Sequence, residues 1–236
     1  MAYSQITRIT FLFSTLTSLS YSATPPPLSH PFKKIYAFGD SYTDTGNTAS
    51  ATGPSSFTYV SNLPYGRTFF HHPTNRYSDG RLVIDFVTQS LSLPYLPPYR
   101  NPKADTSNGV NFAVAGSTAI IHSFFAKNNL TLDITPQSLQ TQLGWFEKYL
   151  ESQGCKGGGE CKGPVFDDAL VWVGEIGAND YAYTLGSSVP SSTVQQLAIA
   201  STTGFLKVII SWKMLFFFFL FTGYSYGCIT WVRCTL

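Results

Sequence analysis

The stretch that decides the fold is IYAFGDSYTDTGN, residues Ile35–Asn47. Its first four residues, Ile35–Phe38, are apolar and predict a buried strand that ends at Gly39. A glycine in this place lets the chain turn sharply and present the next side chains at the carboxyl edge of the sheet. Because open α/β sheets place their sites at that edge, Ser41 is a candidate nucleophile. The alternative is that Ser41 caps a following helix.

Two later segments repeat the pattern of an apolar strand that ends in a turn. Val110–Val114 leads into Gly116, and Ala169–Val173 leads into Asn179. Taken alone, Gly116 is compatible with an ordinary turn, and Asn179 with an Asx turn at a strand end. Strands that alternate with helical segments predict an α/β fold with a mostly parallel sheet.

The segments between these strands predict two helices and one long loop. A helix is predicted over Ser78–Leu91, with Ser78 or Asp79 as its N-cap. A second helix is predicted to open at Thr135, which is followed by a proline suited to the first turn. Four apolar residues recur on one face of this helix: Leu139, Leu143, Phe146 and Leu150. Residues 42–77 have no periodicity and predict a long loop after Ser41.

Three groups of residues resemble, in order, the first three sequence blocks of the GDSL esterase/lipase family (SGNH hydrolases), and especially its plant branch. The first block rests on Phe38, Gly39, Asp40, Ser41, Asp44, Gly46 and Asn47. The second is GVNFAVAGSTA at residues 109–119, and the third is the Gly-x-Asn-Asp of residues 177–180. The resemblance covers roughly residues 33–205, which are expected to form the N-terminal part of a hydrolase domain.

The resemblance implies a flavodoxin-like three-layer α/β sandwich and a serine ester hydrolase. Ser41 would attack a carboxylic or lipid ester. The oxyanion would bind to the N–H of Ser41, the N–H of Gly116 and the side-chain amide of Asn179. The family implies no cofactor and no metal. A small-molecule or lipid ester is therefore the expected partner of a monomeric protein.

The general base of this family is missing from the sequence. The resemblance implies a histidine in an Asp-x-x-His motif near the C-terminus, with the aspartate orienting it. The chain has four histidines, His30, His71, His72 and His122, and none follows an aspartate by three residues. His71 and His72 are in the long loop after Ser41. The sequence therefore predicts a truncated, inactive form with a sheet that is incomplete at the C-terminus. The alternative is a non-catalytic ester- or lipid-binding protein.

The last part of the chain differs in composition from the rest. All 13 Asp and Glu precede residue 205, whereas residues 205–236 carry three basic residues and no acid. Residues 208–236 are predicted to be a hydrophobic tail foreign to the family, translated from an intron. The rival interpretation is a membrane anchor in the uncharged stretch Met214–Val232, and it is the less favoured one.

The first 23 residues resemble a secretory signal peptide, with an apolar segment followed by small residues and a proline run. Secretion is therefore expected, with membrane association through the tail as the alternative. Secretion permits disulfides, and Cys155 and Cys161 flank a glycine-rich loop and are candidates for one; a metal pair is the weaker alternative. Asn129 opens an Asn-Leu-Thr glycosylation sequon. The net charge of only +2 favours no nucleic-acid partner.

Overall fold

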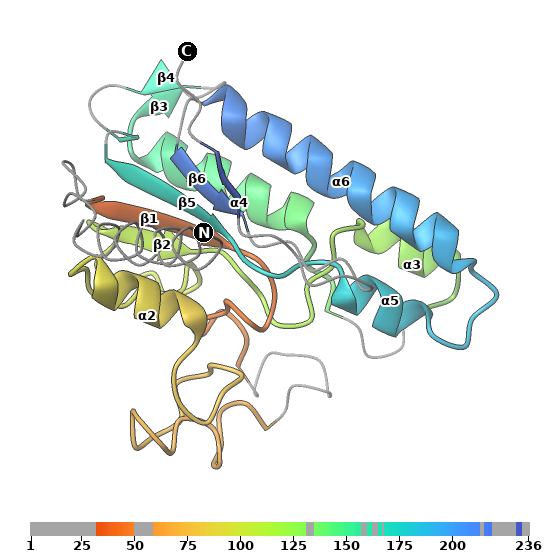
Figure 1. The fold of residues 1–236 in the computed structure, drawn as a ribbon, viewed down its shortest axis with the longest axis horizontal. Coiled ribbons are helices and arrows are strands. Elements are labelled where there is room, and N and C mark those ends of the chain that lie inside the picture. The colour runs from red at the N-terminus through yellow and green to blue at the C-terminus, as the bar shows by residue number, and fades with distance from the viewer. Residues whose placement is uncertain are drawn as a thin grey trace, which may run out of the picture. The chain divides into compact units, whose positions relative to one another are not determined.

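A twisted sheet with helices on both faces forms the centre of the protein in the computed structural model (Figure 1). The structure describes residues 32–49, 59–130, 135–156, 160–161, 165–166, 168–212, 215–218 and 230–232. Within them, five strands follow the order β2-β1-β5-β6-β7. Their bounds are β1 Lys34–Phe38, β2 Gly109–Asn111, β5 Ala169–Val173, β6 Leu215–Phe218 and β7 Thr230–Val232. β7 is antiparallel to β6 and the other pairings are parallel, which confirms the predicted α/β class with a mostly parallel sheet.

The strand order changes direction at β1. The chain places β2 on one side of β1 and then returns to place β5 on the other side. The register pairs Phe38 with Val173, so β1 and β5 end at the same level. In open α/β sheets, ligands bind beyond the carboxyl ends of the strands that flank such a switch point. The turns after Phe38 and Val173 are therefore where a site is expected.

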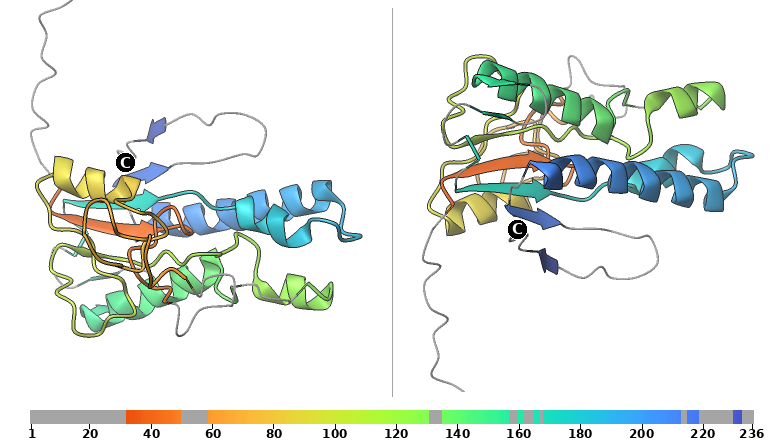
Figure 2. Two further views of the ribbon diagram at one scale, coloured as in Figure 1. Left: turned by 90° about the horizontal axis from the view of Figure 1, so that it is seen from below. Right: turned by 90° about the horizontal axis from the view of Figure 1, so that it is seen from above.

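Both faces of β1 are buried, and successive residues face opposite layers. Tyr36 and Phe38 belong to the larger core, with residues of α4 (Leu139–Ser152) and α6 (Ser191–Ser211). Ile35 and Ala37 belong to the smaller core, with residues at α2 (Val83–Ser90). Figure 2 shows α2 and α4 on opposite sides of the sheet. From Ile35 to Phe38 the strand is apolar because neither of its faces meets water there.

The first predicted helix begins later than expected. α2 starts at Val83 rather than at Ser78, and its N-cap residue is Leu82. The Leu82 N–H donates to the Asp85 carboxylate at 2.8 Å. Ser78 instead belongs to a turn, where its hydroxyl accepts the Gly80 N–H at 3.1 Å. The cap prediction was wrong because the turn already engages this hydroxyl.

The second predicted helix also begins later. α4 starts at Leu139, and its N-cap is Ser138 rather than Thr135. The Thr135 hydroxyl donates to the carbonyl of Ala115 at 2.8 Å, so it makes a tertiary contact instead of a cap. All four residues of the predicted apolar stripe are buried. The spacing of the apolar residues thus predicted the helix correctly, whereas the capping chemistry of Thr135 led to a wrong prediction of where the helix begins.

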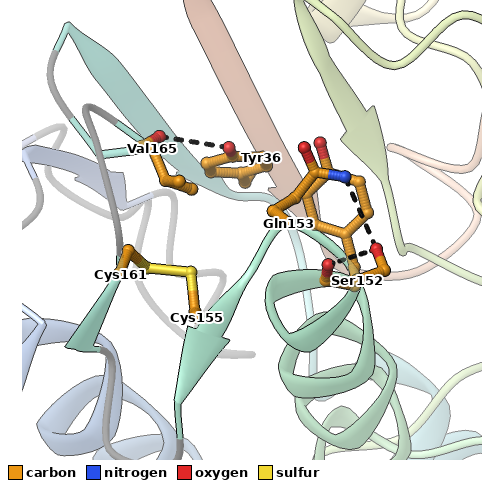
Figure 3. Close-up of a disulfide and its surroundings, with 7 residues drawn as sticks. Tyr36, Ser152, Gln153, Cys155, Cys161 and Val165 are labelled. Carbon is orange, nitrogen blue, oxygen red and sulfur yellow. Dashed lines mark hydrogen bonds between the residues drawn. A yellow bond between two sulfur atoms is a disulfide. The ribbon is translucent and has the colours of Figure 1, made fainter.

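A short hairpin and two short helices complete the described elements. β3 (Cys155–Lys156) and β4 (Glu160–Cys161) pair antiparallel, and a disulfide joins Cys155 to Cys161 (Figure 3). Nearby, the Tyr36 hydroxyl donates to the Val165 carbonyl at 3.3 Å, which ties this region to β1 (Figure 3). The short helices are α3 (His122–Lys127) and α5 (Ala178–Thr184).

The second described part of the long loop, residues 59–77, is held by hydrogen bonds. The Gly66 N–H donates to the Ser78 carbonyl at 2.9 Å. The Arg76 guanidinium makes two hydrogen bonds to the Asp85 carboxylate, at 2.8 and 2.9 Å, and both side chains are buried. This ion pair fixes the end of the loop to the first turn of α2.

The C-terminal stretch is described in two pieces only. Both are strands of the sheet: β6 pairs with β5, and β7 pairs with β6. The rest of the proposed anchor Met214–Val232 and all of the predicted signal peptide lie outside the described residues. Of the described helices, only α6 is long and apolar enough to cross a membrane, and a core helix of a soluble protein meets the same test. α6 does contribute Phe205 and Ile209 to the larger core.

Candidate active site

Ser41 lies on the turn that follows β1. Asp40 organises this turn, because its carbonyl accepts the N–H groups of Thr43 and Asp44 at 3.0 and 2.9 Å. Gly39 has a φ of +140°, a conformation that side-chain-bearing residues rarely adopt. Ser41 is half-buried, and residues 42–49 form turns rather than a helix. The alternative of Ser41 as a helix cap is therefore wrong.

Gln142 of α4 anchors the start of the turn, and sequence reasoning missed it. Its fully buried side chain accepts the Gly39 N–H at 3.0 Å and donates to the Gly39 carbonyl at 2.8 Å. It also donates to the Ser117 hydroxyl at 2.8 Å. One amide side chain therefore holds the peptide before the nucleophile turn and a residue of the second block. The helix repeat is the signal that could have found it, since Gln142 follows Leu139 by three residues on the apolar face, whereas Gln140 of the same helix is exposed.

Asp44 connects the first block to the second. Its buried carboxylate accepts four backbone N–H groups at 2.6–3.1 Å, from Gly46, Asn47, Thr48 and Ala115. Burial raises the pKa of Asp44, and the N–H donors oppose that shift. Asn47 adds to the connection by donating to the carbonyls of Asn111 and Ala113, both at 2.8 Å. Asp44 and Asn47 of the first block therefore have a structural role: their side chains join this turn to the second block.

Hydrogen bonds to two carbonyl groups, those of Gly116 and of Ala115 before it, hold Gly116 in place. It has a φ of +79°. The Tyr183 hydroxyl donates to the Gly116 carbonyl at 2.9 Å, while Thr135 binds the carbonyl of Ala115. Fixing these carbonyls also fixes the plane of the neighbouring peptide units, and so the direction of the Gly116 N–H.

Asn179 brings the three blocks together. Its side-chain nitrogen donates to the Asp40 carboxyl and to the Ser117 carbonyl, both at 2.9 Å. Asp40 precedes Ser41, and Ser117 follows Gly116, so Asn179 contacts the chain neighbours of the other two predicted site residues. The contacts reach across 139 and 62 residues of chain, which makes the Asx-turn alternative wrong. An amide nitrogen has two hydrogens, and both are engaged.

The site carries a group of buried acids. Asp40 and Glu175 are buried side by side, and Asp180 is buried under the second block. Burial, together with Glu175, raises the pKa of Asp40 to about 9. Burial also raises the pKa of Asp180 to about 7, against the opposing N–H groups of Ile120 and Ala119 that bind its carboxylate. Within the described residues, no group of three His, Cys, Asp or Glu is arranged to hold a metal ion.

No described histidine forms a hydrogen bond with Ser41. His71 and His72 are exposed on the long loop, and His122 lies at the start of α3 with its Nδ1 buried and unpartnered among the described residues. His30 lies outside the described residues. In the described part of the chain the Ser41 hydroxyl is therefore without a general base.

The fold and the site define a class of protein: an α/β protein with a serine on the turn after its first strand, and a glycine and an asparagine held beside that turn. A model of the GDSL-like lipase/acylhydrolase family matches residues 35–207. The chain belongs to this family, whose members hydrolyse ester bonds.

Relatives of known name agree with this assignment. A GDSL esterase/lipase of Arabidopsis thaliana is 56% identical over 207 residues, which are 85% of this chain and 52% of that protein. Acetylajmalan esterase 2 of Rauvolfia serpentina is 44% identical over 71% of this chain and 45% of its own length. Sinapine esterase of Brassica napus is 38% identical over 74% of this chain and 45% of its own length. The chain spans about half the length of the curated relatives that it matches.

Proposed function

We propose that this chain carries the nucleophile and the oxyanion site of a serine ester hydrolase. Ser41 attacks the ester carbonyl and forms an acyl-enzyme, the alcohol leaves, and water then releases the acid. The oxyanion binds the N–H groups of Ser41 and Gly116 and the side chain of Asn179. The contact of Asn179 with both Asp40 and Ser117 supports this proposal, because these two residues adjoin Ser41 and Gly116 in the chain.

The substrate is proposed to be a small-molecule or lipid ester. The names of two relatives, acetylajmalan esterase and sinapine esterase, support a small-molecule ester. The proton of Ser41 has no acceptor among the described residues, so we expect this chain alone to be nearly inactive. Loss of a triad member commonly lowers turnover about 10⁴–10⁶-fold.

Chemical rescue tests the proposal. Imidazole added to the full chain supplies a base that the described residues lack, and p-nitrophenyl acetate reports acyl transfer. We expect imidazole to increase hydrolysis beyond its own background, and Ser41→Ala to abolish that increase. Ser90→Ala, at an exposed serine of α2, is the matched control and retains it. Equal rates for the wild type and Ser41→Ala at every imidazole concentration would refute the role of Ser41.

A non-catalytic ester- or lipid-binding protein is the second candidate. This candidate is favoured by the observation that no histidine of the described residues is bonded to Ser41, because such a protein would keep the oxyanion-binding groups without a general base. Isothermal titration of a non-hydrolysable phosphonate ester distinguishes the two. Binding without any imidazole-dependent turnover supports a binding protein, and turnover that depends on Ser41 supports the hydrolase.

We propose further that residues 33–205 are the N-terminal part of the hydrolase domain and that residues 208–236 are an intron-derived tail. A membrane contact through residues 214–232 is the alternative. Sequencing transcripts across codons 200–215 tests this: a frame that continues to an Asp-x-x-His identifies the tail as an artefact. From the sequence we also propose secretion through a signal peptide in residues 1–23 and glycosylation at the exposed Asn129. Recovery of the protein from the medium and a loss of mass on glycosidase treatment would support both.

A further inference from the structure

One oxygen of a buried acid beside the nucleophile turn lacks a hydrogen-bond donor in the part of the chain that the structure describes. Glu175 follows β5, is only 5% exposed, and accepts the Ala178 N–H through its Oε1 at 3.1 Å. Its Oε2 is buried and has no hydrogen-bond partner among the described residues. A buried carboxylate oxygen without a donor is costly, so a proton donor is expected at this point.

The group beside that oxygen is another acid. Asp40 is 1% exposed, and its side chain lies close enough to that of Glu175 for Glu175 to raise the pKa of Asp40. The backbones are joined as well, since the Asp40 N–H donates to the Glu175 carbonyl at 3.1 Å. Two ionised carboxylates in this contact would repel each other and would offer each other no hydrogen. One proton between them converts the contact into a hydrogen bond.

Among the described residues, no positive charge replaces that proton. The ion pairs of the described residues are Lys33–Asp168 and Arg76–Asp85, and neither involves Asp40 or Glu175. Besides Glu175, the groups that face Asp40 are neutral: the Tyr42 N–H and the Asn179 amide. Asp180, which also feels the charge of Glu175, is itself an acid. The raised pKa of Asp40 agrees with this environment.

We propose that Asp40 and Glu175 share one proton, and that this carboxyl–carboxylate pair is a positioning device for Asn179 in the oxyanion site. Protonated Asp40 donates to Glu175 Oε2 and still accepts the Asn179 N–H on its Oδ2. The proposal deepens the proposed function and rests on it for the role of Asn179. It identifies Asp40 and Glu175 as positioning residues, since neither needs to touch the substrate.

The shared proton has two consequences for the reaction. A neutral carboxyl accepts a hydrogen bond less strongly than a carboxylate, so the engaged Asn179 N–H is easier to turn toward an oxyanion. The pair also carries one negative charge instead of two next to the place where negative charge develops. At short range and away from water, a second charge there would oppose the oxyanion. Both effects favour the protonated pair.

A carboxyl titration of the full chain tests the pair directly. With ¹³C-labelled aspartate and glutamate, we expect one aspartate carboxyl to remain protonated at neutral pH and to titrate near pH 9. Asp40→Asn removes that signal. Glu175→Gln moves it to lower pH, because glutamine supplies an N–H donor in place of a negative acceptor. Asp79→Asn, at an exposed acid, leaves it unchanged. If the Asp40 carboxyl is ionised throughout the neutral range, the proposal is wrong.

The imidazole-dependent, Ser41-dependent rate tests the positioning role. Asp40→Ala is expected to lower it about 10²–10³-fold, the usual effect of losing one oxyanion donor. Asp40→Asn, which mimics the protonated acid, is expected to restore it to within a few-fold and to remove its decline at alkaline pH. If Asp40→Asn is as slow as Asp40→Ala, the positioning role is refuted. If the carboxyl titrates as expected but no variant shows a Ser41-dependent rate, the proposed function fails while the pair stands.

Discussion

Replacing Gln142 with methionine should destabilise the fold through the nucleophile turn. Methionine has a similar length and volume, so the change removes the hydrogen bonds without opening a cavity. Gln142 makes three such bonds: one from the Gly39 N–H, one to the Gly39 carbonyl and one to Ser117. The perturbation therefore isolates the polar contribution of one fully buried side chain.

The size of the effect follows from what each partner retains. The Gly39 carbonyl keeps the Val114 N–H at 3.3 Å, and the Ser117 hydroxyl keeps the Gln137 carbonyl at 3.1 Å. The Gly39 N–H has no other partner in the described part of the chain and becomes a buried, unpaired donor, which costs about 1–3 kcal/mol. Weakening the other two groups adds about 1 kcal/mol. We expect a loss of roughly 2–4 kcal/mol in the free energy of unfolding.

Urea denaturation followed by tryptophan fluorescence measures this loss. The matched control is Gln140→Met, at an exposed position of the same helix, for which we expect a change within about 0.5 kcal/mol. In a domain of this size, 1 kcal/mol corresponds to about 2–4 °C in Tm, so a thermal scan checks the same quantity. If Gln142→Met is as stable as Gln140→Met, the Gly39 N–H does not depend on Gln142 and the reasoning is refuted.

Three further predictions concern other parts of the fold. Arg76→Met leaves the buried Asp85 carboxylate unpaired and should cost about 3–5 kcal/mol by urea denaturation, whereas an equal stability would contradict the buried ion pair. The pKa of Asp40 is raised from 3.8 to about 9 in the folded protein, so protonation of Asp40 stabilises the fold. This contribution is complete below pH 3.8 and is lost as the pH rises to about 9. Asp40→Asn should therefore flatten the pH profile of the free energy of unfolding, and an unchanged profile would argue against the prediction. The double substitution Cys155→Ser and Cys161→Ser opens a ring whose ends are six residues apart and should lower the free energy of unfolding by about 2 kcal/mol. This difference from the wild type should vanish when both proteins are measured under reducing conditions.

Local sequence predicted the elements whose physics is local. The run Ala169–Val173 matches β5 at both ends, because a strand buried on both faces is apolar throughout and is bounded by turn residues. The apolar stripe of α4 was correct for a similar reason, since its spacing follows from the helix repeat. The positions of Ser41, Gly116 and Asn179 after three strands also followed from the order of motifs along the chain.

Tertiary contacts decided what the local signals could not. Thr135 has the chemistry of a helix cap, but it binds the Ala115 carbonyl because the second block passes beside it. Gln142 and Glu175 have side chains typical of a surface. The helix repeat places Gln142 on the apolar face of α4, but no neighbouring residue in the sequence indicates which groups Gln142 and Glu175 contact. Their partners Gly39 and Asp40 are more than a hundred residues away. Parallel strands bring such distant turns to one edge of the sheet, and only the folded chain determines which polar groups meet there and which of them must share a proton.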